Sequence, residues 1–204
     1  MTRPRPRSAL LALAVACALL ASAVPIARAD PPAAAWLDDP APANWNTPGA
    51  AVPRPAPPTD AGPIPGMCQG TLRTPETAED QQVADAGWTL WGSYQSGWGV
   101  RIVNGTVSMD AQCRPFGWQA FVFVDGAFAG TLMPGPWAPR SDGTLWDAYL
   151  NAADRIDARF MRYAQPFPLC CPTGEAFVTF DIVRGPNGPV VRPGAPHNQP
   201  IAGS

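Results

Sequence analysis

The chain has 204 residues and a formal charge of −2; 46% of its residues are hydrophobic and 15% are charged, and it contains 27 prolines and five cysteines. An acidic balance of this kind argues against nucleic acid and anionic membranes as partners. The length allows one core of moderate size, while so many prolines indicate segments outside that core.

The first 29 residues have the pattern of a secretory signal peptide. Three arginines precede an apolar run from Ala9 to Ile26, and Ala27-Arg28-Ala29 offers the small residues of a cleavage site. Removing this segment removes four of the 14 basic residues and no acid, which leaves ten basic residues against 16 acidic ones and a charge of −6. No later segment is long and apolar enough to span a bilayer. We therefore expect a secreted or cell-envelope protein without a transmembrane segment.

Cys17 allows a second interpretation of the same segment. The run from Leu13 to Cys17 imitates the site at which bacterial lipoproteins are cut and acylated. However, Ala14 stands where a larger aliphatic residue is usual, and the apolar run continues past the cysteine. We favour the discarded signal peptide and keep the lipid anchor as the alternative.

The absence of lysine and the abundance of alanine and proline indicate a G+C-rich bacterial genome.

Proline divides the remaining chain into three parts. Residues 30–66 and 185–204 are rich in proline and are predicted to be a disordered linker and a disordered tail, because such segments bury little apolar surface. Residues 67–184 are rich in tryptophan, phenylalanine and valine. We expect them to form one disulfide-stapled domain, and the protein to be a monomer.

The domain is predicted to begin with a helix and a hairpin. Thr74 to Ala86 has an N-cap threonine, a proline at the first helical position and a glycine after its end. Two strands, 100–103 and 106–109, flank Asn104-Gly105, a pair that suits the two positive φ angles of a type I′ turn.

A second hairpin pairs residues 118–124 with 127–132 across Asp125-Gly126. Its run Phe121 to Val124 is apolar at every position, so this strand is expected to be central and covered on both faces. The predicted helix is the best candidate for one of these covers.

The remaining elements follow in order as a helix over Thr144 to Ala153, a strand over Ile156 to Tyr163 and a final strand over Phe177 to Val183. Together these elements predict an α+β fold, with an antiparallel sheet of five to seven strands built from hairpins and one or two covering helices.

Four cysteines follow the signal segment, and two of them, Cys170 and Cys171, are adjacent. A disulfide between neighbours closes a strained ring. We therefore expect Cys68 and Cys113 each to bond one member of the pair, in an order that the sequence leaves open. A structural role is favoured over a redox role, because the pair lies in a proline-flanked loop and not at a helix start.

Five segments occur in a fixed order along the chain: Ala111 to Pro115, Gln119 to Leu132, Asp142-Gly143, Ala158 to Tyr163 and Leu169 to Pro172. In this ordered combination, over roughly Gln95 to Val183, the chain resembles the LppP/LprE family of bacterial envelope lipoproteins. The resemblance implies a small exported domain of the actinobacterial envelope with no established enzymatic activity and no catalytic residues to transfer. It also aligns Cys113, Cys170 and Cys171 with the family's cysteines.

Catalytic and metal sites have weak support in the sequence. The single histidine, His197, lies in the predicted tail, and the serines of Gly92 to Gly97 do not fit the nucleophile elbow G-x-S-x-G. Asp125 and Asp142 precede glycines, which turns explain better than paired-carboxylate catalysis. We predict no catalytic, cofactor-binding or transition-metal residues, although a calcium site from scattered aspartates stays open.

Two groups of residues are candidates for a ligand surface. One is an aromatic group around a glycine-rich segment that also contains Tyr94, and the other is a cationic and phenolic group on the strand before residue 164. Core packing and a salt-bridged sheet face are the simpler alternatives. The candidates are Trp88, Trp91, Trp98, Arg159, Arg162 and Tyr163.

These features predict a non-catalytic exported binding or structural module without a cofactor. Its partner would be an envelope component, a glycan, a lipid or another protein. Two alternatives are an exported hydrolase with an unrecognised site and a secreted inhibitor that presents the loop Met133 to Trp137.

Overall fold

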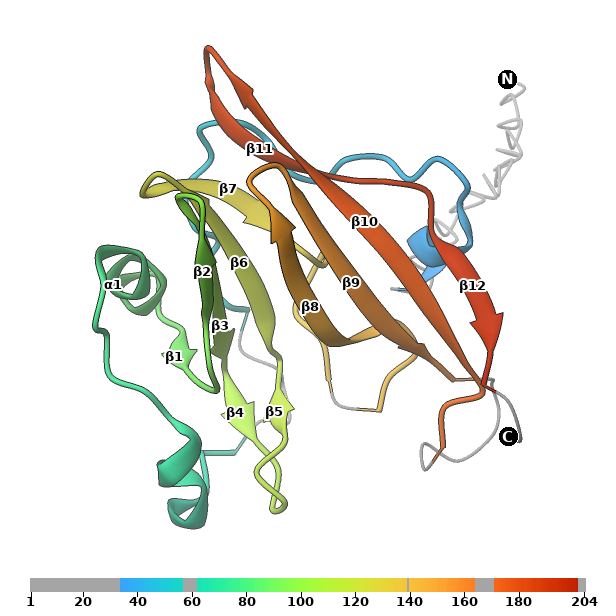
Figure 1. The fold of residues 1–204 in the computed structure, drawn as a ribbon. Coiled ribbons are helices and arrows are strands. Elements are labelled where there is room, and N and C mark those ends of the chain that lie inside the picture. The colour runs from blue at the N-terminus through green and yellow to red at the C-terminus, as the bar shows by residue number, and fades with distance from the viewer. Residues whose placement is uncertain (1–33, 57–61, 139, 164–170, 202–204) are drawn as a thin grey trace, which may run out of the picture. The chain divides into compact units, whose positions relative to one another are not determined.

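The computed structural model describes residues 34–56, 62–138, 140–163 and 171–201, and antiparallel sheets are the main regular structure of these residues (Figure 1). The first sheet has the order β1-β3-β6-β7, and β2 also pairs with β3. Its strands are β1 (Thr89–Leu90), β2 (Gln95–Gly97), β3 (Val100–Thr106), β6 (Gln119–Val124) and β7 (Ala127–Thr131).

The second sheet has the order β11-β10-β9-β8, and β12 pairs with the first part of β10. A short ribbon of β4 and β5 extends from the first sheet (Figure 1). These strands are β8 (Thr144–Ala152), β9 (Arg155–Arg162), β10 (Gly174–Gly185), β11 (Gly188–Pro193), β12 (His197–Pro200), β4 (Ser108–Met109) and β5 (Pro115–Phe116).

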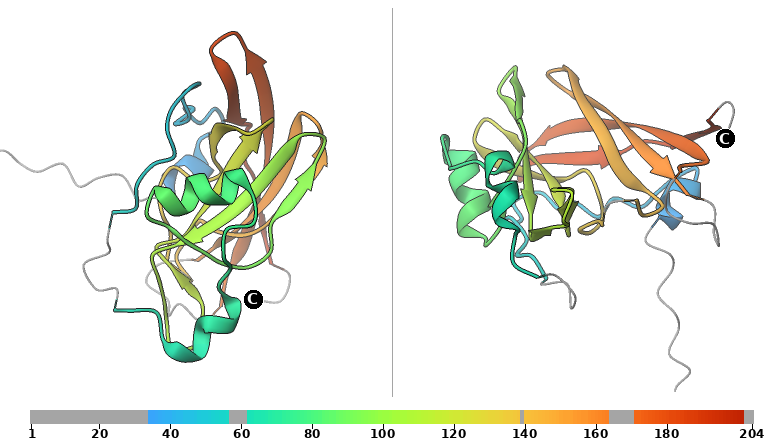
Figure 2. Two further views of the ribbon diagram at one scale, coloured as in Figure 1. Left: turned by 90° about the vertical axis from the view of Figure 1, so that its left-hand side faces the viewer. Right: turned by 90° about the horizontal axis from the view of Figure 1, so that it is seen from below.

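In the described residues three helices accompany the sheets: α1 (Ala78–Asp85) and the 3₁₀ helices η1 (Ala35–Asp38) and η2 (Gly66–Thr71). α1 covers the face of the first sheet that points away from the second sheet (Figures 1 and 2). No helix in the described ranges is both long enough and apolar enough to cross a bilayer. The predicted α+β class is confirmed, but the described residues contain more strands than the five to seven that were expected.

β6 is buried on both faces, as its sequence predicts. Val122 and Val124 belong to the core between the two sheets, whereas Phe121 and Phe123 belong to a second core beneath α1 that contains Val83. The hairpin from β6 to β7 is also confirmed, with positive φ angles at Asp125 and Gly126.

α1 begins later than predicted, with Thr77 and not Thr74 as its N-cap. The Thr77 hydroxyl accepts a hydrogen bond from the backbone N–H of Asp80 at 3.2 Å. The buried Asp80 carboxylate in turn accepts two hydrogen bonds from Arg73, each at 3.0 Å, and one from the N–H of Glu76. This ion pair holds the segment before the helix against it, so the cap moves to Thr77.

The predicted turn at Asn104-Gly105 is wrong, because β3 runs straight through both residues. A Cβ atom on Gly105 would lie only 2.9 Å from the Cβ of Trp88, so the glycine serves close packing beneath α1. The turn lies instead at Trp98 and Gly99, which connect β2 to β3 and have φ angles of 52° and 75°.

The helix predicted over Thr144 to Ala153 is wrong as well, because this segment forms β8 and pairs with β9. Its register shifts between Leu145 and Asp147, and again between Leu150 and Ala152. These irregularities break the two-residue alternation of a strand. The apolar spacing therefore imitates a helix.

The proline-rich ends are part of the fold in the described residues, which corrects the predicted disordered linker at 30–66 and tail at 185–204. β11 and β12 complete the second sheet. Leu37 is fully buried in the main core, and Trp36 and Trp45 pack against it. The domain therefore extends well beyond residues 67–184 on both sides.

Two side-chain amides join the sheets along their edges. Asn46 donates to the carbonyl oxygens of Thr131 in β7 and Val191 in β11, at 3.0 and 3.1 Å, and accepts from the N–H of Thr131. On the other side, Gln95 of β2 donates to the carbonyl of Ala148 and accepts from the N–H of Leu150 in β8. Each amide replaces the backbone pairing that the adjacent strand edges lack.

Candidate functional site

A cleft of about 710 Å³ lies between the start of β8, the end of β9 and the segments that flank β5 and β6. Most of its lining is apolar, and four charged side chains stand among these residues: Arg114, Arg140, Arg159 and Glu175. The largest apolar and aromatic members are Trp91, Trp118, Leu145, Trp146, Met161 and Tyr163.

Trp91 and Trp118 form the wall of the cleft on the side of the first sheet. Their rings meet edge to face, with centroids 5.4 Å apart. The backbone of Trp118 is fixed by two hydrogen bonds with Trp137, both at 2.9 Å. The indole N–H of Trp91 is buried and has no hydrogen-bond partner among the described residues, which is unusual for a buried donor.

The opposite wall comes from β8 and β9. Trp146 occupies the first irregularity of β8, where the pairing with β9 passes from Leu145 to Asp147, and 62% of its surface is exposed. Met161 and Tyr163 lie near the end of β9 and are buried. The irregular register therefore explains why a large aromatic side chain remains at the surface beside the cleft.

The three arginines of the cleft differ in their partners. Arg159 binds Asp147 at 2.6 Å and Glu175 at 3.1 Å, and Arg114 binds Asp110 at 2.5 Å. Arg140 has no ion pair or side-chain hydrogen bond within the described part of the chain. Its backbone is left-handed, with φ at 59°, a conformation that is uncommon for a residue other than glycine.

The phenol of Tyr163 responds to the two arginines nearby. Burial raises the pKa of Tyr163 above its usual value, and the positive charges of Arg140 and Arg114 oppose that rise. The cations of Arg140 and Arg114 therefore act on the same end of the cleft as the phenol.

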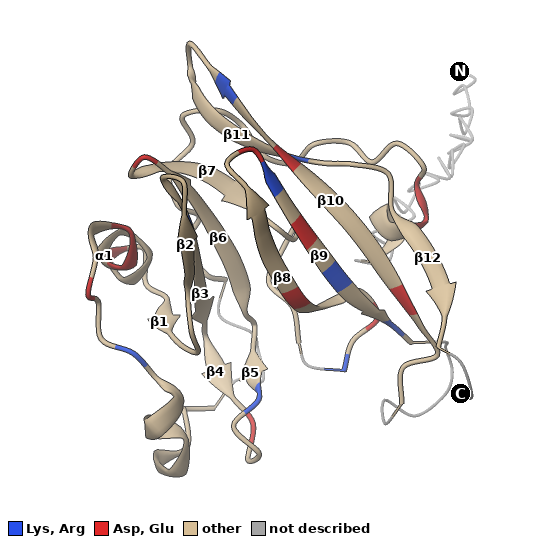
Figure 3. Cartoon of the chain, viewed as in Figure 1, with Lys and Arg blue, Asp and Glu red and all other residues tan. Residues whose placement is uncertain are grey.

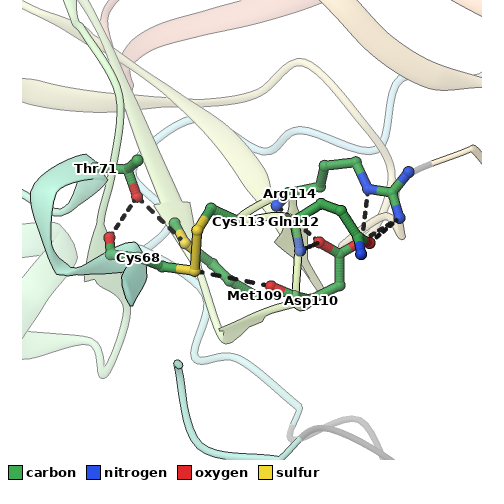
Figure 4. The surroundings of a disulfide bond; sticks show 7 residues. All are labelled: Cys68, Thr71, Met109, Asp110, Gln112, Cys113 and Arg114. Atoms are coloured by element: carbon green, nitrogen blue, oxygen red, sulfur yellow. Dashed lines mark hydrogen bonds and ion pairs between the residues drawn. A yellow bond between two sulfur atoms is a disulfide. The ribbon is translucent and has the colours of Figure 1, made fainter. Parts of the chain in front are cut away.

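The disulfide bond positions Arg114. Cys68 in η2 bonds to Cys113 in the loop between β4 and β5, with the Cα atoms 5.2 Å apart (Figure 4). In this loop the Asp110 carboxylate accepts hydrogen bonds from the N–H groups of Gln112 and Arg114, at 2.9 and 3.0 Å. These bonds lower the pKa of Asp110 although burial opposes ionisation.

The predicted bridges from Cys68 and Cys113 to the adjacent cysteines are therefore wrong. The two-residue strands β4 and β5 fold the loop back beside η2, and strands this short leave little trace in the sequence. Cys171 is exposed, and Cys170 lies outside the described residues.

Three of the six predicted surface residues meet in the cleft, namely Trp91, Arg159 and Tyr163. Trp88 does not, because it is only 4% exposed beneath α1 and donates its indole N–H to the carbonyl of Pro53 at 2.7 Å. Trp98 is 61% exposed, but it lies in the turn between β2 and β3.

Arg162 also lies elsewhere, in an ion-pair network with Asp38 and Asp142, each at 2.9 Å. These contacts, those with Asp38 first, hold the pKa of Arg162 above its usual value. The ring of Tyr94, which was expected beside the tryptophans, is instead contacted by the guanidinium groups of Arg73 and Arg101, which lie 5.1 and 4.9 Å from its centroid.

A comparison with models of protein families bears on the resemblance that the sequence indicates. Residues 100–184 match the LppP/LprE lipoprotein family. This confirms the resemblance that the ordered motifs indicate, and it suggests an exported, envelope-associated lipoprotein of unknown function. No curated protein and no solved structure matches the chain.

The region that matches the LppP/LprE family extends from β3 to β10 and supplies most of the cleft, whereas Trp91 precedes it. Sequence reasoning missed Trp118, Trp146, Met161, Arg114 and Arg140. Trp146 lies in the segment that was expected to be a helix, and Arg140 lies in a loop with no local signal. Only the folded arrangement, which brings the start of β8 and the end of β9 beside the segments that flank β5 and β6, shows that they share a site.

The outer face of the second sheet is a different kind of surface. Acidic and basic residues follow one another along β8, β9 and β10 (Figure 3), over a shallow hollow of about 560 Å³ that His197 also lines. Its charges satisfy each other, because Asp157 accepts hydrogen bonds from Arg155 and from the hydroxyl of Thr179. This arrangement stabilises the sheet and leaves little for a ligand.

The other chemical candidates have structural contacts. Asp142 accepts hydrogen bonds from Arg162 and from the N–H of Tyr163, and Asp125 lies in the β6–β7 turn. Met133 and Trp137, the ends of the loop considered as an inhibitor, are buried. Within the described ranges, no group of three or more histidine, cysteine, aspartate or glutamate side chains could hold a metal ion.

Proposed function

We propose that this chain is a non-catalytic binding protein of the cell envelope, and that the cleft holds a largely apolar ligand. The family match supports an exported setting. The observation that carries the proposal is the convergence of Trp91, Trp118 and Trp146 on one cavity. Its volume of about 710 Å³ is of the size that small-molecule sites have, and such sites are lined mainly by apolar and aromatic side chains.

The charged groups of the cleft favour binding over catalysis. Among the described residues, Glu175 is the one carboxylate in the lining, and it is paired with Arg159. A general base needs a carboxylate or imidazole that can take up a proton near the substrate. An ionised carboxylate held by arginine is poorly suited to that role.

Two exposed tryptophans provide a matched test. Trp146 lines the cleft and is 62% exposed, whereas Trp98 lies outside it and is 61% exposed. We expect the uncharged fluorescent probe N-phenyl-1-naphthylamine to bind saturably to the purified protein. Trp146→Ala should raise its Kd about tenfold through the lost aromatic contact, and Trp98→Ala should leave it unchanged.

If both variants lost the same amount of affinity for N-phenyl-1-naphthylamine, or if the wild-type protein did not bind this probe saturably, the proposal would be contradicted. The hydrolase alternative makes a different prediction for the same protein. Turnover of p-nitrophenyl esters that disappears in Glu175→Gln would favour an enzyme over a binding module.

A further inference from the structure

The cleft contains more positive charge than its own groups neutralise. Three arginines and one glutamate line it, in a protein whose total charge is negative. Arg159 already contacts two carboxylates, and Arg114 contacts one. Arg140 is the lining cation without a carboxylate partner in the described ranges.

The backbone at Arg140 points to the same residue. A left-handed φ of 59° costs free energy for a residue with a Cβ atom, and such conformations cluster at sites of function. A guanidinium group without a partner, at the edge of an apolar cavity, is suited to a carboxylate or a phosphate, which it can bind through two parallel hydrogen bonds.

The neighbours of Arg140 fit an anionic group with an apolar body. Arg140 and Arg114 both lie close enough to the phenol of Tyr163 to act on it electrostatically, and all three residues line the cleft. Elsewhere in the lining, Trp118, Leu145 and Met161 offer apolar surface.

We propose that the ligand is an amphiphile whose carboxylate or phosphate group is bound by Arg140 while its apolar body packs against Trp118 and Trp146. This inference rests on the proposed function of the cleft, because it assigns the chemistry of the molecule held there. It also defines an orientation, with the anionic group at the arginine end.

The test compares three amphiphiles with the same chain: dodecanoate, dodecyl phosphate and dodecanol. Each is titrated against bound N-phenyl-1-naphthylamine, below its critical micelle concentration. We expect at least one of the two anions to displace the probe at concentrations at least tenfold lower than dodecanol does, and the better anion identifies the head group. Inorganic phosphate, which lacks the apolar body, should not displace the probe.

Variants then assign the effect to Arg140. Arg140→Gln should abolish the advantage of the anion over dodecanol and leave the affinity for dodecanol unchanged. Arg192→Gln removes an exposed arginine of β11 outside the cleft. It should change neither the advantage of the anion nor the affinity for dodecanol. Because Arg140 has a positive φ, Arg140→Asn is the second variant, since asparagine tolerates that conformation better.

The outcomes separate the two proposals. If all three amphiphiles displace the probe equally and the Arg140 variants have no effect, the anionic assignment is overturned while the apolar cleft stands. If neither the probe nor any amphiphile binds saturably to the wild-type protein, the proposed function fails and the assignment fails with it. An equal loss in Arg192→Gln would also overturn the role of Arg140.

Discussion

Replacing both Cys68 and Cys113 with serine is expected to lower the free energy of unfolding by about 4 kcal/mol. The bond joins residues 45 positions apart, and the chain-entropy model gives about this value for a loop of that length. The closed loop contains α1 and β1 to β4. Losing the bond therefore frees most of the cover over β6, and urea unfolding of the wild-type and double-variant proteins measures the loss.

Trypsin provides the control for this pairing. It cuts after arginine, and Arg73, Arg101, Arg140 and Arg162 place Cys68, Cys113 and the adjacent cysteines on three different peptides. A non-reducing digest should contain the first two peptides linked to each other. A link from either of them to the peptide with Cys170 and Cys171 would contradict the account. Any sensitivity to dithiothreitol that remains in the double variant comes from that last peptide.

Asp80→Asn is expected to lower the free energy of unfolding by about 3 kcal/mol at pH 7, because it leaves Arg73 without its buried counter-ion. The Asp80 carboxylate is fully buried and makes three hydrogen bonds, two of them to Arg73. Asp85→Asn in the same helix is the matched control, since Asp85 is exposed and its carboxylate accepts a hydrogen bond from Gln81 alone among the described residues. Its cost should stay within about 0.5 kcal/mol.

The dependence on pH follows from the pKa of Asp80. Burial opposes ionisation, but the hydrogen bonds from Arg73 and Glu76 outweigh it and lower the pKa of the carboxyl below its ordinary value. A lowered pKa stabilises the folded state above the unfolded pKa of about 3.9, and this contribution is lost as the pH falls through the folded value. The free energy of unfolding, measured with urea, should decrease less between pH 7 and pH 3 in Asp80→Asn than in the wild type. Equal decreases in the two proteins would contradict this role of Asp80.

The sequence was sufficient to predict those elements whose structure depends on residues that are neighbours along the chain. Asp125-Gly126 adopts the turn that its residue types favour, and Phe121 to Val124 is buried on both sides, as its unbroken apolar run indicates. In both cases neighbours in the sequence determine the structure. The α+β class was predicted from these elements together with the helix that forms α1 and the strands that form β9 and β10.

Contacts between distant segments decided the rest. Asn104-Gly105 has the composition of a turn, but the close approach of the Trp88 and Phe121 side chains requires a glycine within β3. The register of β8 against β9 shifts twice, so its apolar residues lose the alternation of a regular strand and imitate a helical spacing. Asn46, in a segment rich in proline, joins β7 to β11. The sequence around each of these residues carries no sign of its partner.

The same limit applies to the cleft. Trp91, Arg159 and Tyr163 were identified because aromatic and cationic residues stand out in the sequence, yet Trp88 and Trp98 stand out equally and lie elsewhere. Arg140 could be recognised only after the ion pairs of the other arginines had been located.

The indole signals of the eight tryptophans test the central claim, that the cleft is the ligand site. In a ¹⁵N-labelled protein each indole N–H gives its own signal, and mutation assigns it to a residue. Addition of dodecanoate should shift the signals of Trp91, Trp118 and Trp146, which line the cleft, and leave those of Trp88 and Trp98 unchanged. Saturable shifts at Trp88 or Trp98, with the three cleft signals unmoved, would contradict the account.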